Sequence, residues 1–175
     1  TIMHEESRAT PALLVIHYPK RRRAVAGSPK QTWTPESYLE FERASETKQE
    51  FYRGEVFDMP GGSPNHSLIG GNTAALLRQQ LRAKPCRVFQ SDLRLQVRAV
   101  GLYTYPDAFV FCGELQYADK RRDTVTNPTL IIEVLSKSTE SYDRGKKFQH
   151  YRTLETLQEY VLISQDSANI ERFTR

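Results

Sequence analysis

The sequence has few cysteines, no long hydrophobic run and no strong excess of one charge. Cys86 and Cys112 are the only cysteines among 175 residues. Two are too few for a zinc ribbon and make a weak case for a disulfide scaffold, so we expect both thiols to be reduced. No apolar stretch approaches the roughly 18 residues that span a bilayer, and Ala12 to Ile16 is too short for the core of a signal peptide. These absences predict a cytoplasmic protein.

The charge balance is mildly basic. Lysine and arginine number 25 and aspartate and glutamate number 21, which leaves a net charge of +4. This balance permits a nucleic-acid partner but does not require one. The chain is 38% hydrophobic and 10% aromatic, a composition that can bury a core, and its length fits one domain.

Residues 1–30 differ in composition from the rest of the chain. They contain Pro11, Pro19 and Pro29 and a basic run from Lys20 to Arg23, without a lasting helical or strand period. We expect a loosely attached N-terminal arm over 1–30 and a single folded domain over 31–175.

Hydrophobic periodicity predicts alternating helices and strands in that domain. A helix is expected after the cap at Thr34, and a hairpin over Gln49 to Met59. The later expected elements are a helix from Asn65 to Ala83, strand-like segments at Cys86 to Val97, Tyr105 to Cys112 and Thr129 to Leu135, a helix from Asp143 to Tyr151, and strands at Glu159 to Ser164 and Ala168 to Phe173. This order predicts an α/β fold in which helices flank a mixed central β-sheet.

The long helix shows two unusual features. Leu68, Leu76 and Leu81 are predicted to share its apolar face. Gly70 and Gly71 lie inside it, at a cost in helix propensity, and we expect them to let another backbone pack closely.

Charged residues next to or within buried strands point to chemistry. Glu133 has two aliphatic residues on each side, so it must be paired, protonated or bound to a metal. A structural salt bridge to an arginine is the alternative. Asp107 follows Pro106 and leads directly into a hydrophobic strand; alone, it is as well explained as a turn aspartate.

Lys147 is the third candidate, because Asp143, Lys147 and Tyr151 are spaced to share one helix face. An exposed ion pair between Asp143 and Lys147 is the alternative. Two carboxylates on neighbouring strands can hold Mg²⁺, which polarises a phosphodiester and activates water, while a lysine stabilises the developing charge. The three residues together indicate a nuclease site.

The ordered set of motifs resembles the Uma-two family of restriction-endonuclease-like proteins, within the PD-(D/E)XK nuclease superfamily. The motifs are Gly54-Glu55, 61–66, Ser91-Asp92-Leu93, Tyr105-Pro106-Asp107, Glu133-Val134-Leu135-Ser136, Asp143-Arg144 and Glu159-Tyr160. The resemblance covers about Tyr38 to Phe173 and implies a helix, three strands, a helix and a strand as the core.

The resemblance implies a Mg²⁺-dependent DNA endonuclease, with Mn²⁺ as a substitute ion and double-stranded DNA as the substrate. Asp107 and Glu133 match the two acids of the motif and would bind the metal, with the backbone carbonyl of Val134 as a further ligand. The lysine of the motif would fall at position 135, where this chain has Leu135. Lys147 on the following helix would take its role.

Three accessory residues complete the set. His66 opens the long helix and either meets the phosphate or has no chemical role. Asp92 either supports the site or is simply exposed. Tyr151 hydrogen-bonds the site or, as the more common case, packs in the core.

Two other functions remain open. The chain could be a module that binds DNA or a protein on a nuclease fold without cutting, which Leu135 favours. It could also have an assembly role, with Tyr103, Tyr105 and Tyr117 on a dimer face. Because many nucleases of this fold pair to cut two strands, we expect a homodimer.

Overall fold

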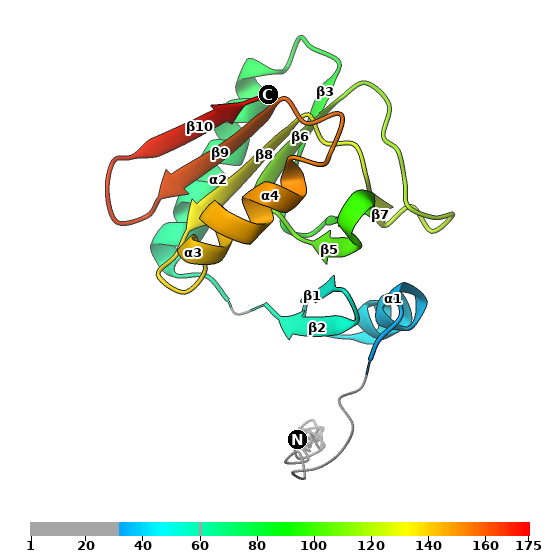
Figure 1. The fold of residues 1–175 in the computed structure, drawn as a ribbon. Helices are drawn as coiled ribbons and strands as arrows, with labels where there is room; N and C mark the ends of the chain where they lie inside the picture. The colour runs from blue at the N-terminus through cyan, green and yellow to red at the C-terminus, as the bar shows by residue number, and fades with distance from the viewer. Residues whose placement is uncertain (1–31, 60) are drawn as a thin grey trace, which may run out of the picture. The chain divides into compact units, whose positions relative to one another are not determined.

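The computed structural model describes residues 32–59 and 61–175, which form a mixed α/β fold (Figure 1). The expected N-terminal arm, residues 1–30, lies outside the described residues. The predicted α/β class is confirmed. The strands, however, divide between two five-stranded sheets and do not form one central sheet.

The first sheet has the strand order β2-β1-β5-β4-β7. Its strands are β1 (Gln49–Tyr52), β2 (Glu55–Asp58), β4 (Arg94–Val97), β5 (Leu102–Thr104) and β7 (Thr124–Val125). The expected hairpin is present as β1 and β2, which pair antiparallel. The turn between them places Gly54 at φ +85°, a conformation that favours glycine.

The second sheet has the order β10-β9-β8-β6-β3. Its strands are β3 (Cys86–Gln90), β6 (Ala108–Cys112), β8 (Leu130–Leu135), β9 (Glu159–Ser164) and β10 (Ile170–Thr174). Neighbours pair antiparallel except β8 and β9, which are parallel. The expected single strand from Cys86 to Val97 is wrong, because a turn after Gln90 separates β3 from β4 and sends them to different sheets.

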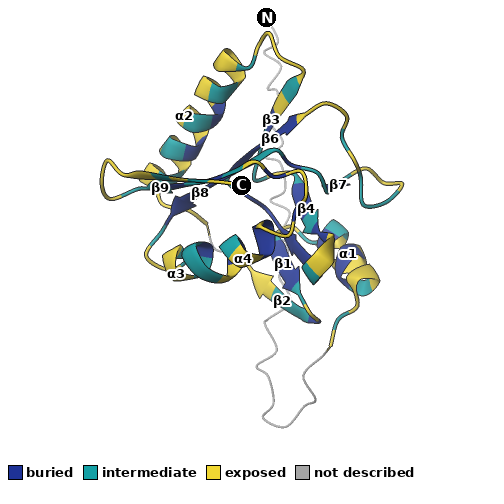
Figure 2. Cartoon of the chain, turned by 45° about the horizontal axis from the view of Figure 1, so that its top comes forward, coloured by how far each residue is buried: buried dark blue, intermediate teal, exposed yellow. Residues whose placement is uncertain are grey.

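Helices cover both faces of the second sheet. The longer helices are α1 (Pro35–Ala44) and α2 (Pro64–Gln80), and 3₁₀-helix η1 spans Arg98–Val100. The expected helix from Asp143 to Tyr151 is in three parts: α3 (Glu140–Tyr142), the π-helical segment η2 (Asp143–Lys147) and α4 (Phe148–Tyr151). Figure 2 shows α2 on one side of β8 and β9, and α3 and α4 on the other.

The apolar face of α2 differs from the predicted one. Leu68 and Leu76 are 64% and 58% exposed, whereas Ala74 is fully buried against Val88 and Val110. The helix therefore packs through a small residue, and its leucines at 68 and 76 face outward. None of the helices in the described part of the chain has the length and apolar character that a membrane span requires.

The cysteines are joined, contrary to the expectation of two reduced thiols. Cys86 and Cys112 lie opposite each other on β3 and β6, with Cα atoms 4.0 Å apart, and form a disulfide. Their sequence separation of 26 hid this pairing, since only the strand register brings the two cysteines together.

The predicted dimer face is also corrected in part. Tyr103 and Tyr105 are only 4% and 6% exposed within the chain, so they cannot form such a face. Tyr117 is half-buried and pairs in an isolated bridge with Val125.

Candidate active site

The two acids of the motif meet at one end of the second sheet. Strand β6 begins at Ala108 and pairs with Ile132 of β8, so Asp107 reaches the level of Glu133 and Val134. The Val134 N–H donates to Asp107 Oδ2 at 2.7 Å, and the Asp107 N–H donates to Glu133 Oε2 at 3.3 Å. These two bonds hold the carboxylates side by side without using all of their oxygens.

Glu133 is almost completely buried, with 3% of its surface exposed. Its Oε1 accepts a hydrogen bond from the Tyr151 hydroxyl at 2.8 Å and lies 3.1 Å from Lys147 Nζ. Burial raises the pKa of Glu133 to about 8, and the nearby Lys147 ammonium opposes that rise. Tyr151 is both a core residue and a partner of the acid, since it is fully buried.

Lys147 is buried among carboxylates. Its Nζ lies 3.1 Å from Glu133, 3.3 Å from Glu50 and 3.5 Å from Asp143. Burial by itself lowers the pKa of Lys147, but the negative charges of Glu133, Glu50 and Asp143 outweigh it, so the pKa is raised well above its ordinary value. The lysine is therefore a fixed cation that joins η2 to β1 and β8.

Two members of this cluster were absent from the predicted site. Glu50 is buried in β1 and accepts a hydrogen bond from the Thr104 hydroxyl. Asp143 entered the sequence argument only as a helical neighbour of Lys147. Glu50 gave a weaker signal than Glu133, because it follows the polar Gln49 in its strand whereas Glu133 has aliphatic residues on both sides.

Asp143 carries a buried oxygen that is not hydrogen-bonded. The residue is 2% exposed, and its Oδ1 has no hydrogen-bond partner among the described residues, although Lys147 lies 3.5 Å away. Asp107, Glu133, Asp143, Glu50 and Lys147 all line one pocket of about 380 Å³. Three carboxyl groups thus surround the Lys147 ammonium, and Asp107 adds a fourth to the pocket, which has an excess of negative charge when the acids are ionised.

His66 forms another wall of this pocket. The Ser63 hydroxyl caps α2 by accepting from the His66 N–H at 3.1 Å, and His66 Nε2 lies 3.2 Å from Asp107 Oδ2. The hydrogen bond to Asp107 raises the pKa of His66, and the Val134 backbone adds to the rise. A Cβ at Gly62 would lie 2.9 Å from His66 Nδ1, so the glycine leaves room for the ring.

The structure thus brings together Asp107, Glu133, Lys147, His66, Tyr151 and Val134. Asp92 is elsewhere: its side chain is 92% exposed and pairs with Lys48. His150, on the same helical segment as Tyr151, is 9% exposed and packs on Tyr52 away from these acids' hydrogen bonds.

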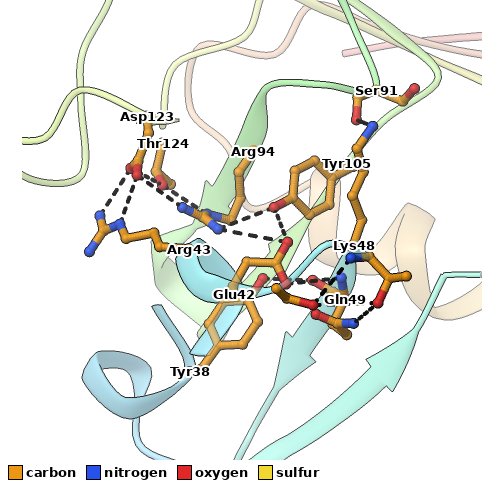
Figure 3. Close-up of polar contacts among 12 residues, drawn as sticks. Tyr38, Glu42, Arg43, Lys48, Gln49, Ser91, Arg94, Tyr105, Asp123 and Thr124 are labelled. Carbon is orange, nitrogen blue, oxygen red and sulfur yellow. Dashed lines mark hydrogen bonds and ion pairs between the residues drawn. The ribbon is translucent and has the colours of Figure 1, made fainter. Parts of the chain in front are cut away.

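A second polar network lies behind the site (Figure 3). Glu42 of α1 accepts from the Gln49 N–H at 3.0 Å and from the Tyr105 hydroxyl, which also accepts from Arg94 at 3.1 Å. Gln49 precedes Glu50, and Tyr105 lies two residues before Asp107. One buried carboxylate therefore ties together the two chain segments that carry these acids.

The donor set fits a hard divalent cation. Within residues 32–59 and 61–175, no three side chains of His, Cys, Asp or Glu are arranged as a ready metal site. Asp107 and Glu133 supply carboxylate oxygens, and His66 approaches Asp107 and the Val134 backbone, so a hydrogen-bond donor already meets two of the expected ligands. Mg²⁺ matches two carboxylates and a carbonyl, since it keeps several waters.

Three comparisons with known proteins agree with one another. The family model Uma2, described as "Putative restriction endonuclease", matches residues 35–175. Two uncharacterized proteins of Synechocystis sp. (strain ATCC 27184 / PCC 6803 / Kazusa) are similar. The protein sll1609 is 37% identical over 81% of this chain and 80% of its own length, and slr1290 is 39% identical over 80% and 73%.

A solved structure shares the fold. It is the crystal structure of "a putative nuclease belonging to DUF820" from Anabaena variabilis ATCC 29413. The TM-score is 0.60 at 20% sequence identity, and the match covers 80% of this chain and 83% of the other.

Proposed function

The chain belongs to the Uma2 family, and we propose that it is a metal-dependent endonuclease that hydrolyses the phosphodiester bonds of DNA. The family description supports a nuclease. The observation that carries the finer proposal is the Asp107–Glu133 pair, joined by two backbone hydrogen bonds in a pocket with more carboxylates than cations.

Asp107, Glu133 and the carbonyl of Val134 would hold Mg²⁺, or Mn²⁺ in its place. A bound divalent ion offsets charge on the phosphodiester and lowers the pKa of the attacking water. Burial raises the pKa of Glu133 and the Lys147 ammonium opposes the rise, so Lys147 favours the ionised carboxylate that a cation would need.

The other side chains have supporting roles. Lys147 stays positively charged and holds Glu133 through an ion pair, while the Tyr151 hydroxyl orients the same carboxylate. Lys147 would also stabilise negative charge that develops on the phosphate. His66 would position the Asp107 carboxylate for the metal from the pocket wall, because its Nε2 lies 3.2 Å from Asp107 Oδ2.

Duplex DNA and a homodimer follow from the proposed reaction. The family description names a restriction endonuclease, and cutting two strands with one site per chain requires two chains. Light scattering at the working concentration tests the dimer, and a monomer at that concentration would contradict it.

Calorimetric titration of Mn²⁺ tests the metal site without requiring a DNA sequence. Wild type should bind Mn²⁺, Glu133→Gln should not, and Asp92→Asn, which changes an exposed acid, should bind as wild type does. Equal binding by wild type and Glu133→Gln would overturn the ligand assignment. Cleavage of plasmid DNA by wild type, absent in both Glu133→Gln and Lys147→Met, would complete the test.

A binding module without catalysis is the second candidate, because Leu135 stands where the motif has a lysine and Lys147 is fully occupied by carboxylates. DNA binding that is unchanged by EDTA, together with no Mn²⁺ binding even when duplex is present, would favour this candidate over the nuclease.

A further inference from the structure

A second pocket, of about 450 Å³, adjoins the catalytic pocket. The two share His66, Asp107 and the Gly61-Gly62 segment in their walls. A polymer bound at Asp107 and Glu133 therefore has a continuous path from the acids into this second pocket, which we call the α2 groove.

Gly70 and Gly71 form one wall of the α2 groove. A Cβ at either position would meet nothing within 4 Å, so neither glycine is there to let another backbone approach, contrary to the expectation from sequence. Two glycines inside a helix cost roughly 1 kcal/mol each relative to alanine. Packing does not explain this cost in helix stability. An open groove that reaches the helix backbone at Gly70 and Gly71 does.

The rest of the lining is mostly polar: it includes the cation Lys48, one further acid, Glu46, and one apolar side chain, Met59. Ser67 lies on the α2 side, and Gln90, Ser91 and Lys48 lie across from it. Lys48 Nζ donates to the Ser91 carbonyl at 2.9 Å and pairs with Asp92, whose side chain is 92% exposed. A pair that is this exposed holds its lysine weakly, so the ammonium is available to an anionic ligand. Lysine, serine and glutamine side chains are common donors to phosphate groups.

Two exposed arginines extend the groove away from the acids. Arg78 lies 3.5 Å from Gln90, and Arg82 follows one turn later just past the end of α2. Within the described part of the chain, neither forms an ion pair with a carboxylate. Ser67, Gly71 and Arg78 share one helix face by their spacing, and they span about 16 Å, the length of about five base pairs.

From these features we propose that the α2 groove binds the sugar–phosphate backbone of the nucleic-acid strand next to the bond that is cut. Lys48, Arg78 and Arg82 contact successive phosphates, and the glycines admit the backbone close to α2. The inference rests on the proposed nuclease function and adds the path of the strand to it. The groove leads from negatively charged acids past Lys48 to Arg78 and Arg82, which form no ion pair among the described residues, and this arrangement matches a polyanion with one phosphate held at a metal.

The test is DNA binding as a function of salt, in EDTA so that nothing is cut. A 30-base-pair duplex and a single strand of the same length are titrated by fluorescence anisotropy. Comparing the two affinities shows whether the groove binds a strand of a duplex or a single strand. The slope of log K against log salt should fall by about 1 for Arg78→Gln and again for Arg82→Gln, since each removes one phosphate contact. Arg152→Gln, at an exposed arginine outside the groove, should keep the wild-type slope.

Gly71→Leu tests the groove itself. Leucine favours the helix, so the variant should fold, yet its side chain fills the groove and should weaken DNA binding at least tenfold. Ala75→Leu, on the exposed face of the same helix, is the matched control and should bind as wild type does. Unchanged slopes and unchanged affinity in all three groove variants would overturn the proposal, as would the absence of measurable binding by wild type to either nucleic acid.

Mn²⁺ titration of the same variants separates this proposal from the nuclease function. Arg78→Gln, Arg82→Gln and Gly71→Leu should retain Mn²⁺ binding. If wild type binds no Mn²⁺ but the groove variants still lose DNA affinity, the groove stands and the catalytic proposal fails. If Mn²⁺ binding is intact and the variants bind DNA normally, the groove proposal fails alone.

Discussion

Two buried polar networks in this protein differ in how completely their charges are matched. Around Glu42, one carboxylate meets the Gln49 N–H and the Tyr105 hydroxyl, and the Arg94 guanidinium lies 4.0 Å away. Around Lys147, three carboxylates share one ammonium, and an oxygen of Asp143 lacks a hydrogen bond. Both networks are buried to a similar degree.

This difference in charge matching indicates that the Glu42 network and the Lys147 network have different roles. A network in which each charged group has partners stabilises the fold and specifies one arrangement of the chain. A network with excess negative charge is unfavourable by itself and is retained where a cation or substrate completes it. The Glu42 network joins the two segments that carry Glu50 and Asp107, so the matched network supports the unmatched one.

The largest expected effect is at the matched network. Glu42→Ala removes the acceptor of two buried donors and the carboxylate near Arg94, and should destabilise the protein by about 3 kcal/mol. Urea denaturation measures the free energy of unfolding. Glu40→Ala, at an exposed position on the same helix, should change it by less than about 0.5 kcal/mol. A loss below about 1 kcal/mol for Glu42→Ala would mean that the network is not what holds α1 to β1 and Tyr105.

Lys147→Met should have an effect that depends on pH. The methionine leaves Glu133, Glu50 and Asp143 buried without their shared cation. Burial raises the pKa of Glu133 and of Asp143, so the loss should grow as these two acids ionise. We expect a loss of about 3 kcal/mol at pH 8.5 and clearly less at pH 5.5, by urea denaturation. Lys146→Met, the exposed neighbour, should show no such dependence. Equal losses at both pH values would show that packing, not charge, is lost.

The smallest effect is expected at the edge of the matched network. Arg43 donates two hydrogen bonds to Asp123, and these hold the pKa of Asp123 at about 2, below its ordinary value. A lowered pKa contributes stability that is present above the unfolded-state pKa near 4 and is lost as the pH falls through about 2.

Asp123→Asn should therefore lower stability by about 1 kcal/mol or less at pH 7, since the carboxylate is about one third exposed. The difference from wild type should shrink as the pH falls from 4 to 2, followed by thermal unfolding. Asp92→Asn serves as the control at a more exposed pair. A difference that stays constant down to pH 2 would argue against the charge as its cause.

Individual residues show how far local sequence could predict the site. Glu133 was found because a charge inside an aliphatic run is anomalous wherever the run lies in the fold. Glu50 was missed because its burial arises only when Lys147 comes to lie 3.3 Å away, from a segment far along the chain. The contact of His66 with Asp107 was equally hidden, since it depends on how α2 leaves the Gly61-Gly62 segment.

The fold shows the same division. Local pattern located the hairpin, the start of α1 and the core strands β8 and β9. It could not show that β3 and β4 join different sheets, or that Cys86 meets Cys112, because strand register is set by pairing between distant segments. It also misplaced the buried face of α2, where Ala74 packs and Leu68 faces outward.

The sequence by itself indicated the class of fold and the family, and it singled out Asp107 and Glu133 as candidate acids. Hydrophobic periodicity, short motifs and a charge within an apolar run can all be recognised from neighbouring residues. Only the tertiary structure decided that three carboxylates surround Lys147 in the pocket that Asp107 also lines, that Glu42 links the segments carrying Glu50 and Asp107, and that a groove runs from the acids along the glycines of α2. These features depend on contacts between side chains from several elements, because the burial of a residue and the balance of charge around it are set only when the chain has folded.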